Sequence, residues 1–455
     1  MLSMRKIVII GNGISGVTTA RHIRKRSEDR IVLISAETPY FFSRTALMYV
    51  YMGHMQFEHT QPYEDWFWEK NRIELMQDYV QSVDTDAKEL QLRDGGVQGY
   101  DVLVLATGSK PNRFGWPGQD LDGVQGLYSY QDLQLLEANT HPPKAKPEER
   151  KVKRAVIVGG GLIGVELAEM LLTRGIEVTF LVREDRFWGN VLPEEEGNLV
   201  ARHMRDHHVD LRFGTELKEI LPGDAGRVKS IVTSTGEEIP CELVGLTAGV
   251  RPNIDFLRDS GIEIDRGILV NRKLETGTPH VYAVGDCAQF RNPVPGRRPI
   301  EQVWYTGRMM GEVTAENITG GNREYDPGPW FNSAKFFDVE YQTYGIVPAH
   351  LPEGQKDFYW AHEEGLACVK VIFNEFDNKF LGINTFGIRM RHDLFDRWLR
   401  EGRDVYYVLS HLKDANFDPE FYRPHEGAIL EKFNAENGTQ LVSAKRSWKR
   451  IFSPT

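Results

Sequence analysis

The chain carries the same strand, loop, helix and strand pattern twice, and this duplication constrains its fold more than any other feature. The first copy reads RKIVIIGNGISGVTTARHIRK followed by RIVLISAE, and the second reads KRAVIVGGGLIGVELAEMLLTRG followed by IEVTFLVRE. In each copy a short β-branched strand leads through a glycine-rich turn into a helix and then into a second strand. That order is typical of the βαβ unit of a parallel, doubly wound sheet. The sequence therefore predicts two Rossmann-like α/β domains.

The first glycine loop, GNGISG, has the spacing of a dinucleotide-binding turn. Its first glycine allows the tight turn, its second lets the backbone approach a pyrophosphate, and its third lets the helix pack closely on the strand. The free N–H groups at the start of the helix then face the anion. An acidic residue at the end of the second strand can accept both ribose hydroxyls of an adenosine. The residues expected at this site are Gly11, Gly13, Ile14, Ser15, Gly16 and Glu37.

The second loop, GGGLIG, repeats this arrangement, but the strand that follows it is ambiguous about the cofactor. Arg183 at the end of that strand can accommodate the 2′-phosphate of NADPH, whereas the neighbouring Glu184 suits the free hydroxyl of NADH. Arg183 slightly favours NADPH, and NADH remains the alternative. The loop residues expected at this second site are Gly159, Gly161, Leu162, Ile163 and Gly164.

The rest of the chain shows where domains begin and end. Residues 139–154 are rich in proline and charge, which predicts an exposed connection. Residues 205–250 alternate short strands with turns, which predicts a hairpin and a return strand. From about residue 325 the strands become rich in aromatic residues and are followed by helical patterns, so a separate α+β domain is expected there.

Composition excludes several classes of function. A net charge of -10 argues against a general nucleic-acid binder, which concentrates Lys and Arg against phosphates. The first apolar run is too short for a secretory segment or a membrane span, so a cytoplasmic protein is expected. The three cysteines, Cys241, Cys287 and Cys368, form no local pair, which argues against a redox disulfide or a cysteine-rich zinc site. Cys287 is expected to pack in the interior because it lacks a partner.

A possible metal pair is discounted on the sequence alone. His203 and His207 have the spacing of one helical turn, but no carboxylate lies near them on the same helix face. A zinc site needs at least three protein ligands. The sequence therefore predicts no metal.

Five segments together resemble a known family. Besides the two glycine loops, the chain contains VLVLATGSKPNRFGWPG, TAGVRPN and VYAVGDCAQF, in the order in which the family has them. The family is that of the flavoprotein reductases with two dinucleotide domains, which includes rubredoxin and ferredoxin reductases, the reductase part of nitrite reductase and apoptosis-inducing factor. The resemblance covers about residues 4–325.

The resemblance implies an FAD site and an NAD(P)H site. It places the backbone of Val80 at the adenine, Arg44 near the flavin or its pyrophosphate, and Asp286 at the ribityl or phosphate region. It also places Glu301 and Trp304 beside the isoalloxazine, with a core aromatic residue as the alternative for Trp304. The FAD contacts implied are Arg44, Val80, Ala106, Thr107, Gly108, Gly285, Asp286, Glu301 and Trp304, and the nicotinamide nucleotide is expected at Arg183 and Gly249 as well as at the second loop.

The fold implied is an FAD domain that is split in the sequence. Its parts would be residues 1–120 and 251–325, with the NAD(P) domain, residues 121–250, inserted between them. Residues 326–455 would form the C-terminal α+β domain. In relatives this last domain forms a dimer interface or covers the flavin, and the sequence leaves a homodimer open.

The catalytic residues of the family are only partly present. Glu166 matches the acidic residue that faces nicotinamide and flavin, with a helix N-terminal carboxylate as the alternative. Some relatives pair it with a lysine after the Arg44 position, where this chain has Met48 and Tyr49. Relatives that reduce disulfides or peroxide carry a cysteine close to the same segment, where this chain has Phe41, Phe42, Ser43 and Arg44 and no cysteine before position 241. A thiol-based reaction is therefore not expected.

The resemblance implies an oxidoreductase that passes electrons from NAD(P)H through FAD to a small protein carrier of the rubredoxin or ferredoxin kind. Two alternatives stay open. One is an NAD(P)H:quinone reductase or oxidase, and the other is a flavin-stabilised interaction or signalling protein with vestigial activity. The basic C-terminal segment SAKRSWKRIFSPT suggests contact with a membrane surface or an acidic carrier, although a disordered tail or a packed helix is favoured for so short a segment.

Overall fold

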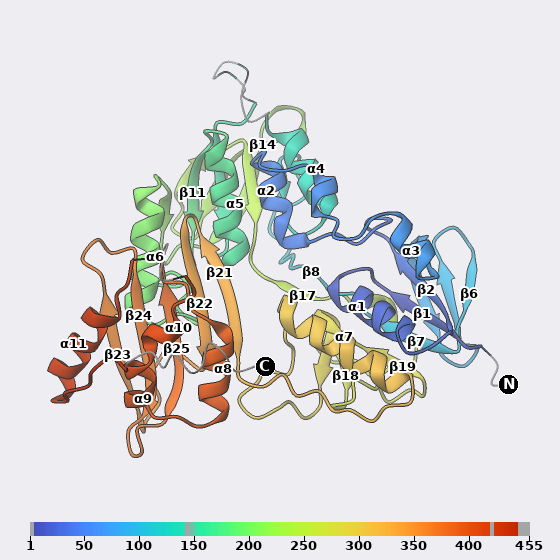
Figure 1. Cartoon of the computed structure of the whole chain (residues 1–455). Helices are drawn as coiled ribbons and strands as arrows, with labels where there is room; N and C mark the ends of the chain where they lie inside the picture. Colours follow the sequence, from blue (N-terminus) through green and yellow to red (C-terminus); the bar gives the residue numbers. More distant parts are fainter. Residues whose placement is uncertain (1–3, 142–145, 147–148, 150, 419–422, 445–455) are drawn as a thin grey trace. The chain divides into compact units, whose positions relative to one another are not determined.

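The computed structural model describes residues 4–141, 146, 149, 151–418 and 423–444. It divides into two compact units (Figure 1). The first consists of residues 1–159, 167–180 and 216–327, and the second of residues 160–166, 181–215 and 328–455. Most of the basic C-terminal segment, residues 445–455, and part of the predicted connection at 139–154 lie outside the described residues.

The first unit contains the parallel sheet predicted for the first βαβ copy. Strand β1 lies between β2 and β7, and the order of the sheet is β19-β7-β1-β2-β3 with parallel neighbours throughout. The strands are β1 (Lys6–Ile10), β2 (Arg30–Ser35), β3 (Ile73–Gln77), β7 (Val102–Leu105) and β19 (Val281–Ala283). Because β19 comes from far downstream in the chain, this sheet is assembled from two separate stretches of sequence.

A second parallel sheet follows the second βαβ copy. Strand β10 (Arg154–Val158) pairs with β16 (Leu243–Leu246), which pairs with β9 (Val124–Gln125). The order of the sheet is β12-β11-β10-β16-β9, where β12 is Asp210–Arg212. Helix α5 (Leu162–Thr173) joins β10 to β11 (Glu177–Leu181). The predicted pair of Rossmann-like α/β folds is therefore confirmed.

Smaller elements complete the first unit. The hairpin predicted within residues 205–250 is present as the antiparallel sheet β13-β14-β15, and another antiparallel sheet runs β4-β5-β6. The remaining elements are β4 (Val80–Asp84), β5 (Glu89–Leu92), β6 (Val97–Gly99), β8 (Ser109–Pro111), β13 (Leu217–Pro222), β14 (Val228–Thr233), β15 (Glu238–Pro240), β17 (Val250–Pro252), β18 (Ile268–Val270), β20 (Ala288–Phe290), α2 (Leu47–Tyr51), α3 (Trp66–Lys70), α4 (Tyr130–Asn139) and α7 (Trp304–Ile318).

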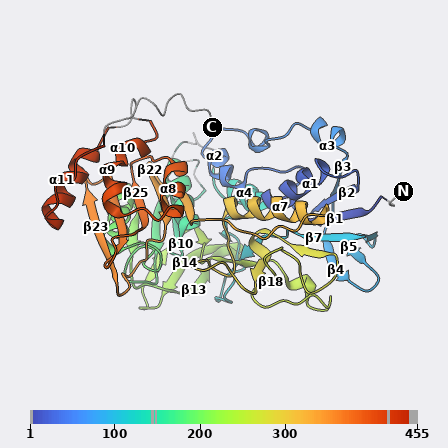
Figure 2. The same cartoon turned by 60° about the horizontal axis from the view of Figure 1, so that its bottom comes forward.

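Two helices lie side by side on the first sheet. Helix α1 (Ile14–Arg24) and helix α7 approach closely in both views (Figures 1 and 2). A Cβ atom at Gly311 would stand 2.7 Å from the carbonyl oxygen of Ser15, and one at Gly307 would stand 2.6 Å from its Oγ. Real Cβ atoms do not approach so closely, so only glycine permits this contact. The four-residue spacing of the two glycines in TGRMMGEV is the sequence signal for this contact.

The second unit contains the predicted α+β domain. Its antiparallel sheet has the order β21-β22-β25-β24-β23, and helices of the C-terminal region pack against it (Figure 2). Its elements are α6 (Glu194–Asp206), β12 (Asp210–Arg212), β21 (Phe331–Phe336), β22 (Val339–Gly345), β23 (Gln355–Ala361), β24 (Cys368–Asn374), β25 (Phe380–Phe386), α8 (His392–Arg400), α9 (Val405–Ser410), α10 (Leu412–Ala415) and α11 (Glu426–Asn437). In the described part of the chain, no helix combines the length and hydropathy needed to cross a bilayer.

Helix α6 buries one carboxyl group completely. Glu196 is 0% exposed, and its Oε2 accepts a hydrogen bond from Asn384 at 2.7 Å. Burial raises the pKa of Glu196 to about 8, against the opposing effects of Asn384 and the charge of Lys370. The carboxyl group is therefore protonated in the folded chain at neutral pH.

This buried acid makes the second unit less stable at high pH. Because the pKa of Glu196 is higher in the folded than in the unfolded chain, its contribution is fully present below pH 4.5 and is lost as the pH rises towards about 8. We expect the free energy of unfolding to fall by roughly 3 kcal/mol more in the parent than in Glu196→Gln between pH 5 and pH 8, at about 1.4 kcal/mol per pKa unit. Urea unfolding of both proteins across this range measures the difference. Parallel curves for the two proteins would contradict the assignment.

Candidate cofactor site

The first glycine loop has the geometry expected for a pyrophosphate. Gly11 has a φ of 109°, and a Cβ atom there would overlap the carbonyl oxygen of Ala106. A Cβ at Gly16 would overlap the carbonyl oxygen of Gly11, so helix and strand touch through backbone. A Cβ at Gly13, by contrast, would meet nothing within 4 Å. Gly11 and Gly16 are therefore packed against backbone, whereas the space beside Gly13 is open. Helix α1 begins directly after Gly13, so its free N–H groups face this space.

Glu37 is held in place at the end of β2 by Arg44. The guanidinium donates to both carboxylate oxygens, at 2.9 and 2.6 Å, and the backbone N–H of Tyr130 donates to Oε1 at 2.8 Å. Burial would lower the pKa of Arg44, but the hydrogen bonds and charge of Glu37 raise it, so the pair is ionic. Oε2 accepts one of these bonds and has a second lone pair for a hydroxyl donor.

This ion pair gives Arg44 a structural role beside the cofactor contact that the resemblance implies. The resemblance implies a place for Arg44 near the flavin or its pyrophosphate, and the structure shows its guanidinium donating to Glu37 and to the carbonyl oxygen of Tyr128, the latter at 2.6 Å. Its role in positioning the predicted ribose-binding carboxylate did not follow from the sequence, because the two residues belong to different elements.

The segment after β7 is tied to the strand that follows the second sheet. Thr107 donates through Oγ1 to the carbonyl oxygen of Asn253 at 2.8 Å, and the N–H of Asn253 donates to the carbonyl oxygen of Gly108 at 2.9 Å. Ala106 continues the sheet by donating to the carbonyl oxygen of Ile10. Gly108 has a φ of 64°, which favours glycine. The turn is therefore held in place beside the first glycine loop by backbone hydrogen bonds and by the Thr107 hydroxyl.

Asp286 lies in a polar cluster that the sequence did not predict. Ser109 donates to its Oδ2 at 3.0 Å, and Gln302 donates to Ser109 Oγ at 2.8 Å. Burial raises the pKa of Asp286, against the hydrogen bond from Ser109 and the charge of Arg44. The preceding Gly285 has a φ of 74° and abuts Ser15, so Asp286 stands next to the first turn of α1. Ser109 and Gln302 are thus additional candidate site residues.

Glu301 and Trp304 differ in their surroundings. Glu301 is buried, accepts two hydrogen bonds from Arg297 at 2.6 and 3.1 Å, and accepts a third from Tyr325 at 2.6 Å. Its side-chain oxygens are thus committed to the protein. Trp304 is 37% exposed at the start of α7 and packs edge-on against Tyr305, which is 36% exposed. Of the two residues, Trp304 has the side chain that is accessible to a ligand.

The second glycine loop repeats the pattern of the first. Gly159 has a φ of 124°, and a Cβ there would stand 2.5 Å from the carbonyl oxygen of Thr247. A Cβ at Gly161 would meet nothing within 4 Å. Arg183 and Glu184, the pair that leaves the nucleotide ambiguous, contact each other at 2.9 Å, and the Arg183 side chain is 69% exposed. The remaining predicted residues are Leu162, Ile163, Gly164 and Glu166, which lie in the first turns of α5.

Gly249 also adopts a conformation that favours glycine. Its φ is 83°, and its carbonyl oxygen accepts from the N–H of Asn112 at 3.0 Å. The amide of Asn112 donates to the carbonyl oxygen of Ala248 at 3.3 Å. The Thr-Ala-Gly turn after β16 is therefore held by Asn112, which directly follows β8. Val80 begins β4 and is buried.

The three cysteines are all free and buried. Cys287 packs as expected, with its thiol donating to the carbonyl oxygens of Leu105 and Val284 at 3.4 and 3.3 Å, and burial raises its pKa. Burial likewise raises the pKa of Cys241 to about 12. Reactive cysteines are exposed and have a lowered pKa, so these thiols are structural.

Two parallel sheets, each opening through a glycine loop into a helix, are typical of a protein that binds two dinucleotides. The family model described as pyridine nucleotide-disulphide oxidoreductase matches residues 5–311, and the chain belongs to this family. The family binds FAD and uses NAD(P)H. The open glycine positions and the fixed carboxylates Glu37 and Asp286 fit FAD in the first unit.

The relatives of the chain include reductases of several kinds. It is 31% identical to the nitrite reductase [NAD(P)H] of Bacillus subtilis over 64% of this chain and 35% of that protein, so it spans about a third of that relative. It is 31% identical to a ferredoxin–NAD(P)(+) reductase of Sphingomonas over 76% of this chain and 82% of the relative. The crystal structure of a ferredoxin reductase from Rhodopseudomonas palustris matches with a TM-score of 0.75 and 25% identity, covering 84% of this chain and 91% of the other. The chain is an FAD-dependent NAD(P)H oxidoreductase.

Proposed function

We propose that this enzyme takes a hydride from NADH or NADPH and delivers the electrons to a small, acidic protein electron carrier. Bound FAD supplies the redox chemistry, accepting two electrons and releasing them to the acceptor. The observation that carries the proposal is the absence of a thiol route. The segment in which thiol-using relatives carry a cysteine reads FFSR at residues 41–44 and contains none, and all three cysteines of the chain are buried. Free, buried cysteines are also typical of a reducing compartment, which supports a cytoplasmic location.

The residues of the chain bind and orient the reacting groups. Gly13 and the start of α1 would hold the pyrophosphate, Glu37 the ribose and Asp286 the ribityl region of FAD. Arg183 would contact a 2′-phosphate, while Glu184 favours a free ribose hydroxyl. Trp304, exposed at the start of α7, would cover the flavin and exclude water. Glu166 would orient the nicotinamide from α5.

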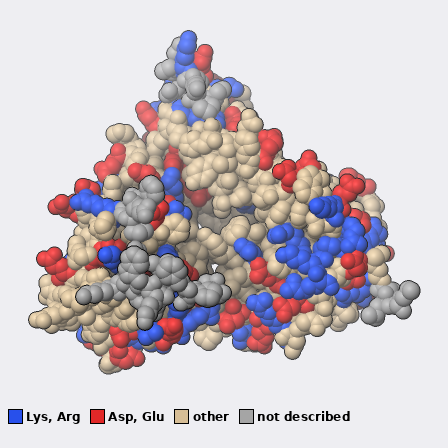
Figure 3. All heavy atoms as spheres, in the orientation of Figure 1, with Lys and Arg blue, Asp and Glu red and all other residues tan. Residues whose placement is uncertain are grey.

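A basic patch on the first unit favours an acidic partner. Although the net charge is -10, Figure 3 shows Lys and Arg side chains gathered over α1 and the adjoining part of α7. We define the patch as Arg21, Lys25, Arg26 and Arg308. Arg308 lies one helical turn after Trp304. A patch of one sign raises the rate of encounter with a partner of the opposite sign.

Reversing charge on this patch is expected to slow reduction of a carrier without affecting a small acceptor. The double variant Lys25→Glu, Arg26→Glu should lower kcat/KM for an acidic ferredoxin about tenfold at low salt, because electrostatic steering raises association rates by roughly 10–1000-fold. The difference should shrink as salt screens the charges. Steady-state turnover with the ferredoxin and with a neutral quinone measures both effects.

The matched control reverses two exposed lysines elsewhere on the same unit. Lys218→Glu, Lys229→Glu has the same change in charge on β13 and β14 and should leave ferredoxin turnover near the parental value. If the parent reduces quinone faster than any ferredoxin, or if both double variants lose activity equally, the proposed carrier is wrong. The quinone reductase would then be the better assignment.

A further inference from the structure

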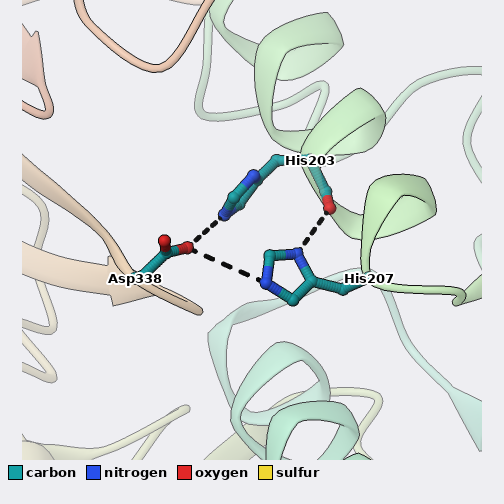
Figure 4. A group of neighbouring side chains, drawn as sticks. All are labelled: His203, His207 and Asp338. Atoms are coloured by element: carbon teal, nitrogen blue, oxygen red, sulfur yellow. Dashed lines mark hydrogen bonds and ion pairs between the residues drawn. The ribbon is translucent and has the colours of Figure 1, made fainter.

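A cluster of two histidines and one aspartate lies on the second unit (Figure 4). His203 and His207 come from α6 and its end, and Asp338 comes from the turn between β21 and β22. His203 Nε2 lies 2.6 Å and His207 Nε2 lies 3.9 Å from Asp338 Oδ1. The three ligand atoms all lie within 4.8 Å of one another. The expectation of no metal rested on the lack of a nearby carboxylate, and the fold supplies one from a distant strand turn.

The orientation of His207 suits a metal ligand. Its Nδ1 lies 2.9 Å from the carbonyl oxygen of His203, and a carbonyl can only accept, so Nδ1 carries the proton. In the neutral ring Nε2 then has a free lone pair, and it faces Asp338 (Figure 4). A hydrogen bond from the other ring nitrogen to a carbonyl is the usual way in which proteins orient a metal-binding histidine.

The turn that carries Asp338 is held in an uncommon conformation. Phe336 pairs with Val339, so Phe337 and Asp338 form a two-residue turn, and Phe337 has a φ of 56°. This conformation is disfavoured for a bulky residue. The Phe337 ring is buried and stacks on His207, with centroids 4.5 Å apart. The stacking fixes both the imidazole and the turn, and so directs the carboxylate towards the two histidines.

The geometry points to a binding site for a divalent transition-metal ion of the zinc type, formed by His203 Nε2, His207 Nε2 and Asp338. Imidazole and carboxylate ligands suit Zn²⁺, which takes four ligands at roughly 2.0–2.2 Å. Tetrahedral ligands at that distance lie about 3.3 Å apart, between the 2.6 and 3.9 Å observed. Asp338 is 70% exposed, so it can make this adjustment, and water can take the fourth position. The metal would join α6 to the β21–β22 turn.

Zinc binding by the FAD-loaded, tag-free full-length chain tests this site. The protein is stripped with a chelator and dialysed against micromolar ZnCl₂, and bound zinc is counted by elemental mass spectrometry. We expect one tightly bound ion per chain and a higher unfolding temperature with zinc, because a ligand that binds the folded state stabilises it. His207→Gln and Asp338→Asn should each weaken binding by at least about tenfold.

The matched control is the neighbouring histidine. His208 is exposed and lies outside the cluster, so His208→Gln should bind zinc like the parent. Both test variants alter partly or largely exposed side chains, and circular dichroism checks that they fold. If the parent binds no zinc at micromolar concentration, or if both test variants bind as the parent does, the cluster is an ion pair without a metal and the proposal is wrong.

Discussion

A Gly13→Val variant is expected to fold like the parent chain and to be purified almost free of FAD. A Cβ at Gly13 would meet nothing within 4 Å, and the φ of -68° at this residue is open to any amino acid. The same open position is where the pyrophosphate would approach the backbone. We expect the affinity for FAD to fall at least about 100-fold, which corresponds to roughly 3 kcal/mol. The ratio of flavin to protein absorbance measures it, and circular dichroism measures the fold.

Two other glycine substitutions make this result specific. Gly427→Val places the same side chain in open space on α11 and should retain FAD. Gly11→Ala should prevent correct folding, because its Cβ would overlap the Ala106 carbonyl oxygen and the φ of 109° at this position disfavours alanine. That variant should lose its fold as well as its flavin. Parental FAD content in Gly13→Val would place the cofactor elsewhere.

Substitution of Glu301 is expected to lower the stability of the folded chain, whether or not FAD is bound. Its side chain is 2% exposed and the guanidinium of Arg297 is 6% exposed, so the ion pair is fully desolvated. Removing one partner of such a pair leaves a buried charge and costs about 3–5 kcal/mol. Glu301→Ala should therefore lower the free energy of unfolding by that amount, also in protein stripped of FAD. Denaturant unfolding of the apoprotein measures it.

A combined substitution separates the buried charge from the loss of side-chain volume. Arg297→Met, Glu301→Leu, Tyr325→Phe removes the charges and the hydroxyl that donates to Glu301, and should recover most of the lost stability. If Glu301→Ala keeps its stability but loses affinity for FAD, the cofactor contact implied by the resemblance would be the correct role.

Local patterns made much of the fold predictable. The order of strand, glycine loop and helix is set by residues that are close in sequence. Both parallel sheets and both loops could therefore be predicted from it. Strands β9 and β19 are too short to show a pattern of their own, with two and three residues. Their places in the sheets are set by pairing with distant strands, which periodicity does not report. The resemblance indicated such a place for β19 through the segment VYAVGDCAQF.

The side-chain contacts of the site were less predictable. The Glu37–Arg44 pair, the Ser109–Asp286 hydrogen bond and the approach of Asp338 to His203 each join residues from different elements. Such pairs depend on how the elements pack against one another, and this packing cannot be read from a local pattern in a single sequence. Gly307 and Gly311 are an exception, because their four-residue spacing in α7 was readable as a close helix contact.

The proposed function requires electron flow from a nicotinamide nucleotide into FAD bound at the first glycine loop. Anaerobic mixing of the yellow protein with NADH and, in parallel, with NADPH tests this most directly. We predict that at least one nucleotide bleaches the visible flavin absorbance within a single turnover, and that oxidised ferredoxin restores it. A flavin that neither nucleotide reduces would contradict the assignment and leave FAD as a structural cofactor.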